Sequence, residues 1–397
     1  MIAIAASPIL TRVYSPENFN IFGLYLGLSA ILGAVTTGRY EMAILLPKKD
    51  NDAVNVLGLS ILVSMIVSSL IFLFLIIIKF SNKSILEHTV LGSFIFLIPL
   101  STLILGIYNS LNYWNNRRKN YNILSSGRII YSLLVALITI MLGFTILING
   151  GLIFGTILGQ GLAAIFLISL IIIREKSYLK KINYTKIRLL SKRYFKFPKF
   201  LIAGHLMNTS SSQLPLILFS SYFISPVGGF FLLTQRVISL PISIISSSIG
   251  DVFRQQASLD YAQNKNCTEL YLSTFRKLVF ISIIPFVAFY FSAPIFFETV
   301  FGESWKKSGE FAQILVPMFF LQFVTSPLSN MFIIAEKQEL DLLWQLFLFM
   351  SVLLSLSLGI FIFKDEFIAV ALFSFSYSIS YIVNFFMTLS FSKGKKK

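Results

Sequence analysis

The chain has 397 residues, of which 56% are hydrophobic and only 13% are charged, and its net charge is +16. A soluble protein carries about 25% charged residues, so this composition excludes a water-soluble globule and predicts an integral membrane protein. The positive charge does not indicate nucleic-acid binding, because the basic residues lie in short loops between apolar runs, where they set membrane orientation. The single cysteine, Cys267, excludes an internal disulfide, and no cofactor or metal is expected.

Eleven apolar runs approach the length of about 20 residues that a membrane-spanning helix needs. They cover residues 22–37, 56–78, 90–111, 124–147, 152–173, 197–219, 227–249, 278–300, 311–334, 342–363 and 368–389. An apolar segment at residues 1–10 has about half the required length, and a turn signal follows it at Ser15-Pro16. We interpret this segment as the end of a twelfth helix that is truncated at the N-terminus, because a signal peptide would have a positive n-region.

Lysine and arginine are distributed unequally between alternate connections. One set of connections, from the loop with Arg39 to the C-terminal tail, holds 25 basic residues, and the other set holds 6. Cytoplasmic loops carry the excess in membrane proteins. The first set is therefore predicted to be cytoplasmic, together with both ends of the intact protein.

The longest connection, residues 174–196, is basic with interleaved apolar side chains and lies at the middle of a twelve-helix chain. Such a segment is expected to lie on an anionic inner leaflet. The predicted organisation is an all-α N-terminal lobe at residues 1–173, a basic cytoplasmic linker at 174–196 and a C-terminal six-helix lobe at 197–397.

Arg236 lies near the middle of the apolar run at residues 227–249. A charge at that depth is costly and usually faces a bundle interior or a water-filled path. Ser239, Ser243 and Ser246 follow at spacings of three and four residues, so they share its helix face. One interpretation is that Arg236 is structural and pairs with a carboxylate on another helix. We favour the other, in which Arg236 is functional and lines a water-filled path.

The run at 197–219 also has a polar face. Its members follow at spacings of three and four residues: His205, Asn208, Thr209, Ser212 and Gln213. One explanation for such residues is interhelical hydrogen bonding, which stabilises helix packing modestly. A hydrated cavity shared with the neighbouring helix of Arg236 also explains them, and we favour it for the stripe as a whole.

Two further arginines lie near the predicted inner surface. Arg128 is about one turn inside the fifth helix, where a long side chain can extend to the interface. Arg39 ends the second helix and is placed to form a salt bridge with Glu41. Acidic residues avoid the helix centres, and Asp251 is interpreted as the end of the eighth helix.

Three motifs resemble a known family. Residues 10–19 are LTRVYSPENF, residues 37–50 are TGRYEMAILLPKKD, and residues 251–257 are DVFRQQA. Together with the helix layout, they resemble the bacterial oligosaccharide flippases of the multidrug/oligosaccharidyl-lipid/polysaccharide exporter superfamily. The resemblance implies two six-helix lobes around a central cavity and alternating access in the bacterial cytoplasmic membrane. It also implies a polyprenyl-diphosphate-linked oligosaccharide as cargo, for surface polysaccharide of the O-antigen or capsule type.

A flippase for this cargo must hydrate a sugar head and neutralise a diphosphate, and arginine suits phosphate because its fork donates paired hydrogen bonds. We therefore expect Arg236 to contact the diphosphate or an acidic sugar. The remaining residues expected along the path are His205, Asn208 and Gln213, with Arg39 or Arg128 at its cytoplasmic mouth. Expected partners are the lipid-linked oligosaccharide and membrane lipids, with glycan polymerase or ligase machinery as a further candidate and no nucleic acid.

Two other functions stay open at this point. A cation-coupled drug antiporter of the same superfamily would be expected to use acidic intramembrane residues, which the spans lack. A membrane glycan polymerase or ligase would carry a sizeable outer loop with catalytic residues, whereas the outer loops here are short. Signatures of soluble enzymes, such as a P-loop or a Gly-x-Ser-x-Gly elbow, do not occur in the sequence. We therefore expect a transporter and not an enzyme.

Overall fold

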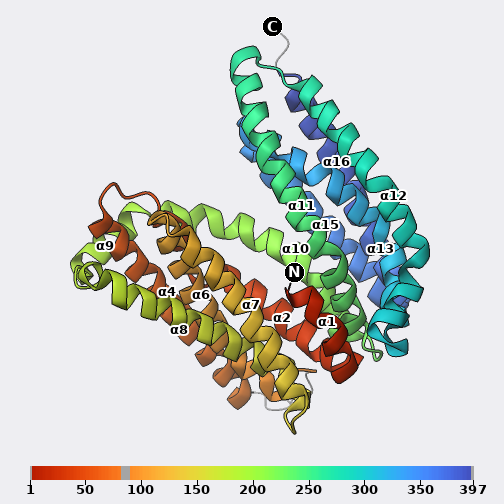
Figure 1. Ribbon diagram of the computed structural model, residues 1–397, viewed down its shortest axis with the longest axis horizontal. Coiled ribbons are helices and arrows are strands. Elements are labelled where there is room, and N and C mark those ends of the chain that lie inside the picture. Colours follow the sequence, from red (N-terminus) through yellow and green to blue (C-terminus); the bar gives the residue numbers. More distant parts are fainter. Residues whose placement is uncertain (1, 82–89, 395–397) are drawn as a thin grey trace. The chain divides into compact units, whose positions relative to one another are not determined.

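The computed structural model describes residues 2–81 and 90–394, and nearly all of them are helical (Figure 1). No strand occurs in these two ranges. Met1 and the last three lysines, which enter the predictions above, lie outside the described residues. Packing divides the chain into two compact units, Ile2–Ser221 and Tyr222–Lys397, and each is described by itself.

The first unit is a bundle in which α7 packs along α8, α4 along α6, α1 on α7, and α9 on α4. Its helices are α1 (Ile2–Val13), α2 (Pro16–Thr36), α3 (Tyr40–Ala43), α4 (Asp50–Ser81), the 3-10 helix η1 (Gly92–Leu97), α6 (Ile98–Arg117), α7 (Tyr121–Gly143), the 3-10 helix η2 (Ile148–Gly150), α8 (Gly151–Leu179), α9 (Tyr184–Arg193), the π-helix η3 (Phe197–Leu201) and α10 (Ile202–Tyr222), whose last residue begins the second unit.

In the second unit, α13 packs against α12, α16 and α11, and α15 packs on α16. Its helices are α11 (Val227–Asn264), α12 (Thr268–Phe301), the 3-10 helix η4 (Glu303–Trp305), α13 (Lys306–Thr325), the 3-10 helix η5 (Ser326–Asn330), α14 (Met331–Ile334), α15 (Gln338–Ser357), the π-helix η6 (Leu358–Phe363) and α16 (Glu366–Ser392).

All eleven predicted runs are helical over most of their length, with turns at residues 90–91 and 144–147, and the apolar N-terminal segment forms α1. The described residues contain ten helices that are long and apolar enough to cross a membrane, which confirms an all-α multi-pass membrane protein. α10 is not among the ten; it carries the polar stretch at residues 204–213, which lowers its mean hydropathy. The lobe boundaries proposed from the sequence, at 174–196, stay a prediction.

The predicted turn at Ser15-Pro16 separates α1 from α2. The Ser15 hydroxyl accepts a hydrogen bond from the backbone N–H of Asn18, and the Asn18 side chain accepts one from the backbone N–H of Ser15. This reciprocal cap satisfies two N–H groups at the helix start that have no partner within the helix. Pro16 occupies the first helical position, where its missing N–H costs nothing.

α11 is longer than its apolar run. The sequence placed the end of this helix near Asp251, but the helix continues to Asn264, so that interpretation of Asp251 is wrong. An apolar run marks the part of a helix that lipid surrounds, whereas the helix itself persists while one face stays packed. Here Phe253 and Ala257 are buried in a cluster with Tyr271, which supports the extension beyond the apolar run.

An ion-pair network joins the ends of α4, α6 and α8. Asp50 accepts from Arg117 Nη2 at 2.9 Å and from Arg118 Nη1 at 2.6 Å. Arg118 also contacts Glu175 at 3.2 Å, and the indole of Trp114 donates to the same carboxylate at 2.7 Å. A network of partly buried charges stabilises a structure more than isolated surface pairs do, so these contacts fasten the three helices to one another at this end of the bundle.

The close contact between α7 and α8 depends on small residues. A Cβ at Gly159 would lie 2.6 Å from the backbone nitrogen of Val135 and 2.7 Å from its Cα. Both atoms belong to the backbone of α7, so no side-chain movement relieves the overlap. Glycine at this position therefore allows the close approach of the two helices.

We expect Gly159→Ala to lower thermal stability, by about 1–3 kcal/mol, because the added methyl overpacks a backbone contact. Gly161→Ala is the matched control, since its Cβ would meet only Ile104 Cδ1 at an ordinary 3.7 Å and alanine favours a helix over glycine by about 1 kcal/mol. Thermal unfolding of both variants in detergent measures the difference. Equal melting temperatures would contradict the packing argument.

Candidate functional site

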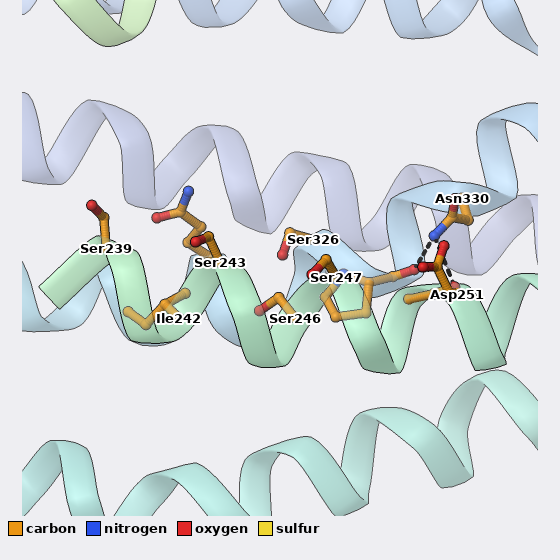
Figure 2. Close-up of a pocket in the computed structure, with 11 residues that line it drawn as sticks. Ser239, Ile242, Ser243, Ser246, Ser247, Asp251, Ser326 and Asn330 are labelled. Atoms are coloured by element: carbon orange, nitrogen blue, oxygen red, sulfur yellow. Dashed lines mark hydrogen bonds between the residues drawn. The ribbon is translucent and has the colours of Figure 1, made fainter. Parts of the chain in front are cut away.

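A polar pocket lies in the second unit between α11 and the segment where α13 passes into η5 (Figure 2). Its cavity volume is about 410 Å³, within the range of small-molecule sites. We call it the serine pocket. Its polar lining side chains are Ser239, Ser243, Ser246, Ser247 and Asp251 of α11, with Gln322, Ser326 and Asn330 opposite.

The lining positions of α11 recur at spacings of three and four residues, so one helix face supplies them all. The stripe formed by Ser239, Ser243 and Ser246 thus borders a cavity, as the sequence pattern predicted. Arg236 lies on the same face one turn before Ser239, about 4.5 Å along the helix axis. Its side chain is partly buried.

Hydrogen bonds hold the far wall of the serine pocket against α11. The Asn330 amide donates to the carbonyl oxygens of Gly250 at 3.2 Å and Pro327 at 2.9 Å (Figure 2). The hydroxyl of Ser246, a residue that is 7% exposed, has no hydrogen-bond partner among the described residues. A buried hydroxyl without a partner costs about 1–3 kcal/mol, so this group calls for water or a ligand in the pocket.

Charged residues lie at or beyond the two ends of the serine pocket. Asp251 is the charged residue of the lining; its side chain is 74% exposed and contacts Arg254 at 3.3 Å. Arg236 lies beyond the opposite end. Solvent screens the exposed Asp251–Arg254 pair, whereas a charge inside an apolar run is screened much less.

An apolar groove adjoins the serine pocket between α11 and α12, with a volume of about 260 Å³. Its walls are Val237, Ile238, Pro241 and Ile242 on α11 and Pro285, Phe286, Phe289 and Phe296 on α12. Ile242 lines both spaces. One helix therefore presents a polar face to the pocket and an apolar face to the groove, and the two meet at a single side chain.

In the first unit, the predicted salt bridge between Arg39 and Glu41 is present, with 3.3 Å between Nη1 and Oε1. Glu41 is buried and also accepts from the Thr37 hydroxyl. Arg39 has a left-handed backbone, with φ of 61°, which is uncommon for a residue other than glycine. Its charge acts electrostatically on His205, so the structure brings these two predicted site residues together.

The other predicted residues lie at separate places. Asn208 is exposed on α10, and Gln213 donates to the Ser212 hydroxyl at 3.3 Å. Arg128 is exposed on α7 and lines a second polar pocket, between α6 and α7. These residues belong to the first unit and Arg236 belongs to the second, so a path common to all of them stays a prediction.

Sequence reasoning missed two groups of polar residues. Asn109, Asn112 and Asn116 on α6 line the second pocket, and their spacing of three and four residues was a usable signal. Ser326 and Asn330 face the serine pocket from η5. With Gln322 they recur every four residues, which was also a usable signal, although the chain passes from α13 into the 3-10 helix η5 at Ser326.

These features define a multi-pass helical membrane protein with polar cavities inside its bundles. The profile of the polysaccharide biosynthesis protein family matches residues 9–310, and the chain belongs to that family. No curated protein matches the sequence.

Solved structures share the fold. An inward-facing multidrug resistance MATE family transporter of the MOP superfamily has 16% identity and a TM-score of 0.74, over 98% of this chain and 93% of that chain. The lipid II flippase MurJ in an inward closed conformation has 13% identity and a TM-score of 0.76, over 98% and 87%. A MATE protein in complex with MaL6 has 12% identity and a TM-score of 0.60, over 98% and 93%. At these identities the likeness establishes the fold.

If the serine pocket is hydrated, Ser243→Cys should react with a membrane-impermeant maleimide and Ile245→Cys should not. The two residues are exposed on nearly opposite faces of α11, so only the first faces the pocket. The measurement is labelling of membranes from a Cys267→Ala background at pH 7.5. In protein that retains Cys267, this thiol should react slowly, because burial raises the pKa of Cys267 to about 11 and the thiolate is the nucleophile. Equal labelling of both variants would contradict a hydrated pocket.

Proposed function

We propose that this protein is a flippase that moves a polyprenyl-diphosphate-linked oligosaccharide across the bacterial cytoplasmic membrane by alternating access. The observation that carries the proposal is the pairing of two spaces on α11. The serine pocket and the apolar groove lie on adjacent faces of one helix and share Ile242. An amphiphile with a polar head and a hydrocarbon tail matches such a pair of surfaces.

The physical task of a flippase explains the polar lining. A sugar head cannot cross hydrocarbon without losing its hydrogen bonds to water, which costs several kcal/mol for each unpartnered polar group. Hydroxyl and amide side chains replace those bonds, and the serine pocket supplies them from Ser243, Ser246 and Gln322. The isoprenoid tail needs no such replacement, because it stays in apolar surroundings in the groove and the bilayer.

Arg236 is assigned to the diphosphate or to an acidic sugar. It lies at the end of the serine pocket away from Asp251, where the anionic group of the cargo avoids that carboxylate. Guanidinium binds phosphate through paired, charge-assisted hydrogen bonds, each worth about 1.5–3 kcal/mol. His205, Asn208 and Gln213 are assigned to the same path, with Arg39 and Arg128 at its cytoplasmic mouth.

The family membership supports a role in polysaccharide biosynthesis, and we assign that role to the assembly of surface polysaccharide of the O-antigen or capsule type. In this scheme the linker at residues 174–196 joins two six-helix lobes on the cytoplasmic side, and both ends of the intact protein are cytoplasmic. The flipped product then passes to a glycan polymerase or ligase on the outer face. The chain itself performs no covalent step.

Arg236→Ala should lower export of the lipid-linked glycan about tenfold or more, since one charge-assisted contact is worth about 1.5–3 kcal/mol. Arg236→Glu should abolish export, because a carboxylate repels the diphosphate. Arg276→Ala is the matched control, an exposed arginine on α12 that does not line either space. Export is measured as surface glycan in a complemented deletion strain, with protein levels determined by immunoblot.

The lipid-linked intermediate identifies the class of function. Complete repeat units that accumulate on the inner leaflet of the deletion strain support a flippase. Unpolymerised or unligated units on the outer leaflet would indicate a polymerase or ligase instead, and altered drug tolerance with normal glycan would indicate an antiporter. Normal export by both Arg236 variants at normal protein levels would overturn the assignment of Arg236.

A further inference from the structure

The second polar pocket lies between α6 and α7 and has a volume of about 550 Å³. We call it the asparagine pocket. α6 contributes three asparagines from one helix face, and α7 contributes a serine and an arginine. The polar side chains used in the argument are Tyr108, Asn109, Asn112, Asn116, Ser125 and Arg128.

Buried polar atoms in this pocket have no protein partner. Tyr108 is 8% exposed, and neither its hydroxyl nor the side-chain oxygen of Asn112 has a hydrogen-bond partner among the described residues. Two other buried tyrosines are satisfied: the Tyr14 hydroxyl donates to Thr139 O at 2.6 Å, and the Tyr271 hydroxyl bonds to the Thr388 hydroxyl at 2.8 Å. The pocket therefore contains hydrogen-bonding groups that the fold leaves without a partner.

The neighbouring asparagines show what a structural role looks like. The Asn115 amide donates to Leu111 O at 2.9 Å, and Asn120 donates to the Asn115 side chain at 3.3 Å. In contrast, the side chains of Asn109 and Asn116 make no hydrogen bond to any described residue. Within one segment of chain, the asparagines that support the fold are thus distinct from those that face the pocket.

The charge of the pocket favours an anionic ligand. Its lining contains Arg128 and no carboxylate, and no ion pair joins Arg128 to any described residue. Tyr108 is held in place by the ring of Tyr131, with 5.5 Å between centroids. The pocket therefore combines a positioned aromatic ring, amide groups that both donate and accept, and one guanidinium.

We propose that the asparagine pocket binds the sugar that is attached to the diphosphate of the cargo. Neighbouring sugar hydroxyls each donate and accept a hydrogen bond, which matches the two-sided chemistry of asparagine amides. Arg128, which the proposed function places at the cytoplasmic mouth of the path, contacts the phosphate next to this sugar before the cargo reaches Arg236. This inference rests on the proposed function and adds a site in the first unit that discriminates glycosylated from bare lipid diphosphate.

Two soluble probes separate sugar binding from diphosphate binding. One is farnesyl diphosphate, and the other is farnesyl diphosphate that carries a single N-acetylhexosamine. Dissociation constants for the full chain in nanodiscs are measured by isothermal titration calorimetry. Wild-type protein should bind the glycosylated probe more tightly than the bare one.

Tyr108→Phe and Asn112→Ala should each weaken binding of the glycosylated probe about three- to tenfold, the loss of one hydrogen bond, and leave the bare probe unchanged. Tyr108→Phe removes one oxygen atom and keeps the ring, so it should fold normally. Asn122→Ala is the matched control, an exposed asparagine on α7 outside the pocket. Wild-type protein that does not distinguish the probes, or variants that keep the wild-type ratio, would overturn the proposal.

Thiol labelling gives a second measurement. Asn112→Cys in the Cys267→Ala background should react with an impermeant maleimide, and the glycosylated probe should protect it more than the bare probe. An unreactive Asn112→Cys would mean that the pocket is closed or filled by protein, which also overturns the proposal. Arg236 lies in the other unit, so Arg236→Ala tests the proposed function separately. If Arg236→Ala leaves glycan export intact while Tyr108→Phe still weakens binding of the glycosylated probe, the role given to Arg236 fails and the sugar site stands.

Discussion

The constraint on which the whole structure depends is that hydrocarbon offers no hydrogen bonds. Every backbone N–H and C=O in the bilayer must find a partner within the protein, so the spans are helices. The same constraint governs hydroxyl side chains. Many serines and threonines of the spans donate to the carbonyl oxygen three or four residues earlier, as Ser64 does to Ser60 and Thr139 does to Val135. They are thus satisfied without any cavity.

These hydrogen bonds within a helix affect how polar residues in the spans are interpreted. A serine on an apolar helix says little, because its own helix supplies an acceptor. Ser239 and Ser247 behave in this way although they line the serine pocket. Ser246, Tyr108 and Asn112 do not, since each has a buried polar atom without a partner among the described residues. Within the two polar pockets, these atoms require a hydrated or occupied space.

Composition and periodicity predicted the fold class, the eleven helical runs and the serine stripe, because these properties depend on local order along one helix. The salt bridge between Arg39 and Glu41 was also predictable, since the two residues are close in sequence. The asparagine pocket was not recognised, because it requires α6 and α7 to meet with their polar faces toward one another. Pairing between helices depends on packing contacts, such as Gly159 on Val135, that a single sequence does not display.

The apolar groove follows from a second feature of local chemistry. Pro241 of α11 and Pro285 of α12 both line it, and proline lacks the N–H that would bond to the carbonyl four residues earlier. Each helix therefore loses a bond at the level where the groove opens, and its backbone bends more easily there. Because Ile242 directly follows Pro241 and separates groove from pocket, a bend of α11 at this point changes both spaces together. The helix that we propose to hold the head and tail of an amphiphile on two faces is thus also the one whose backbone is weakened between them, which suits a carrier that must release what it binds.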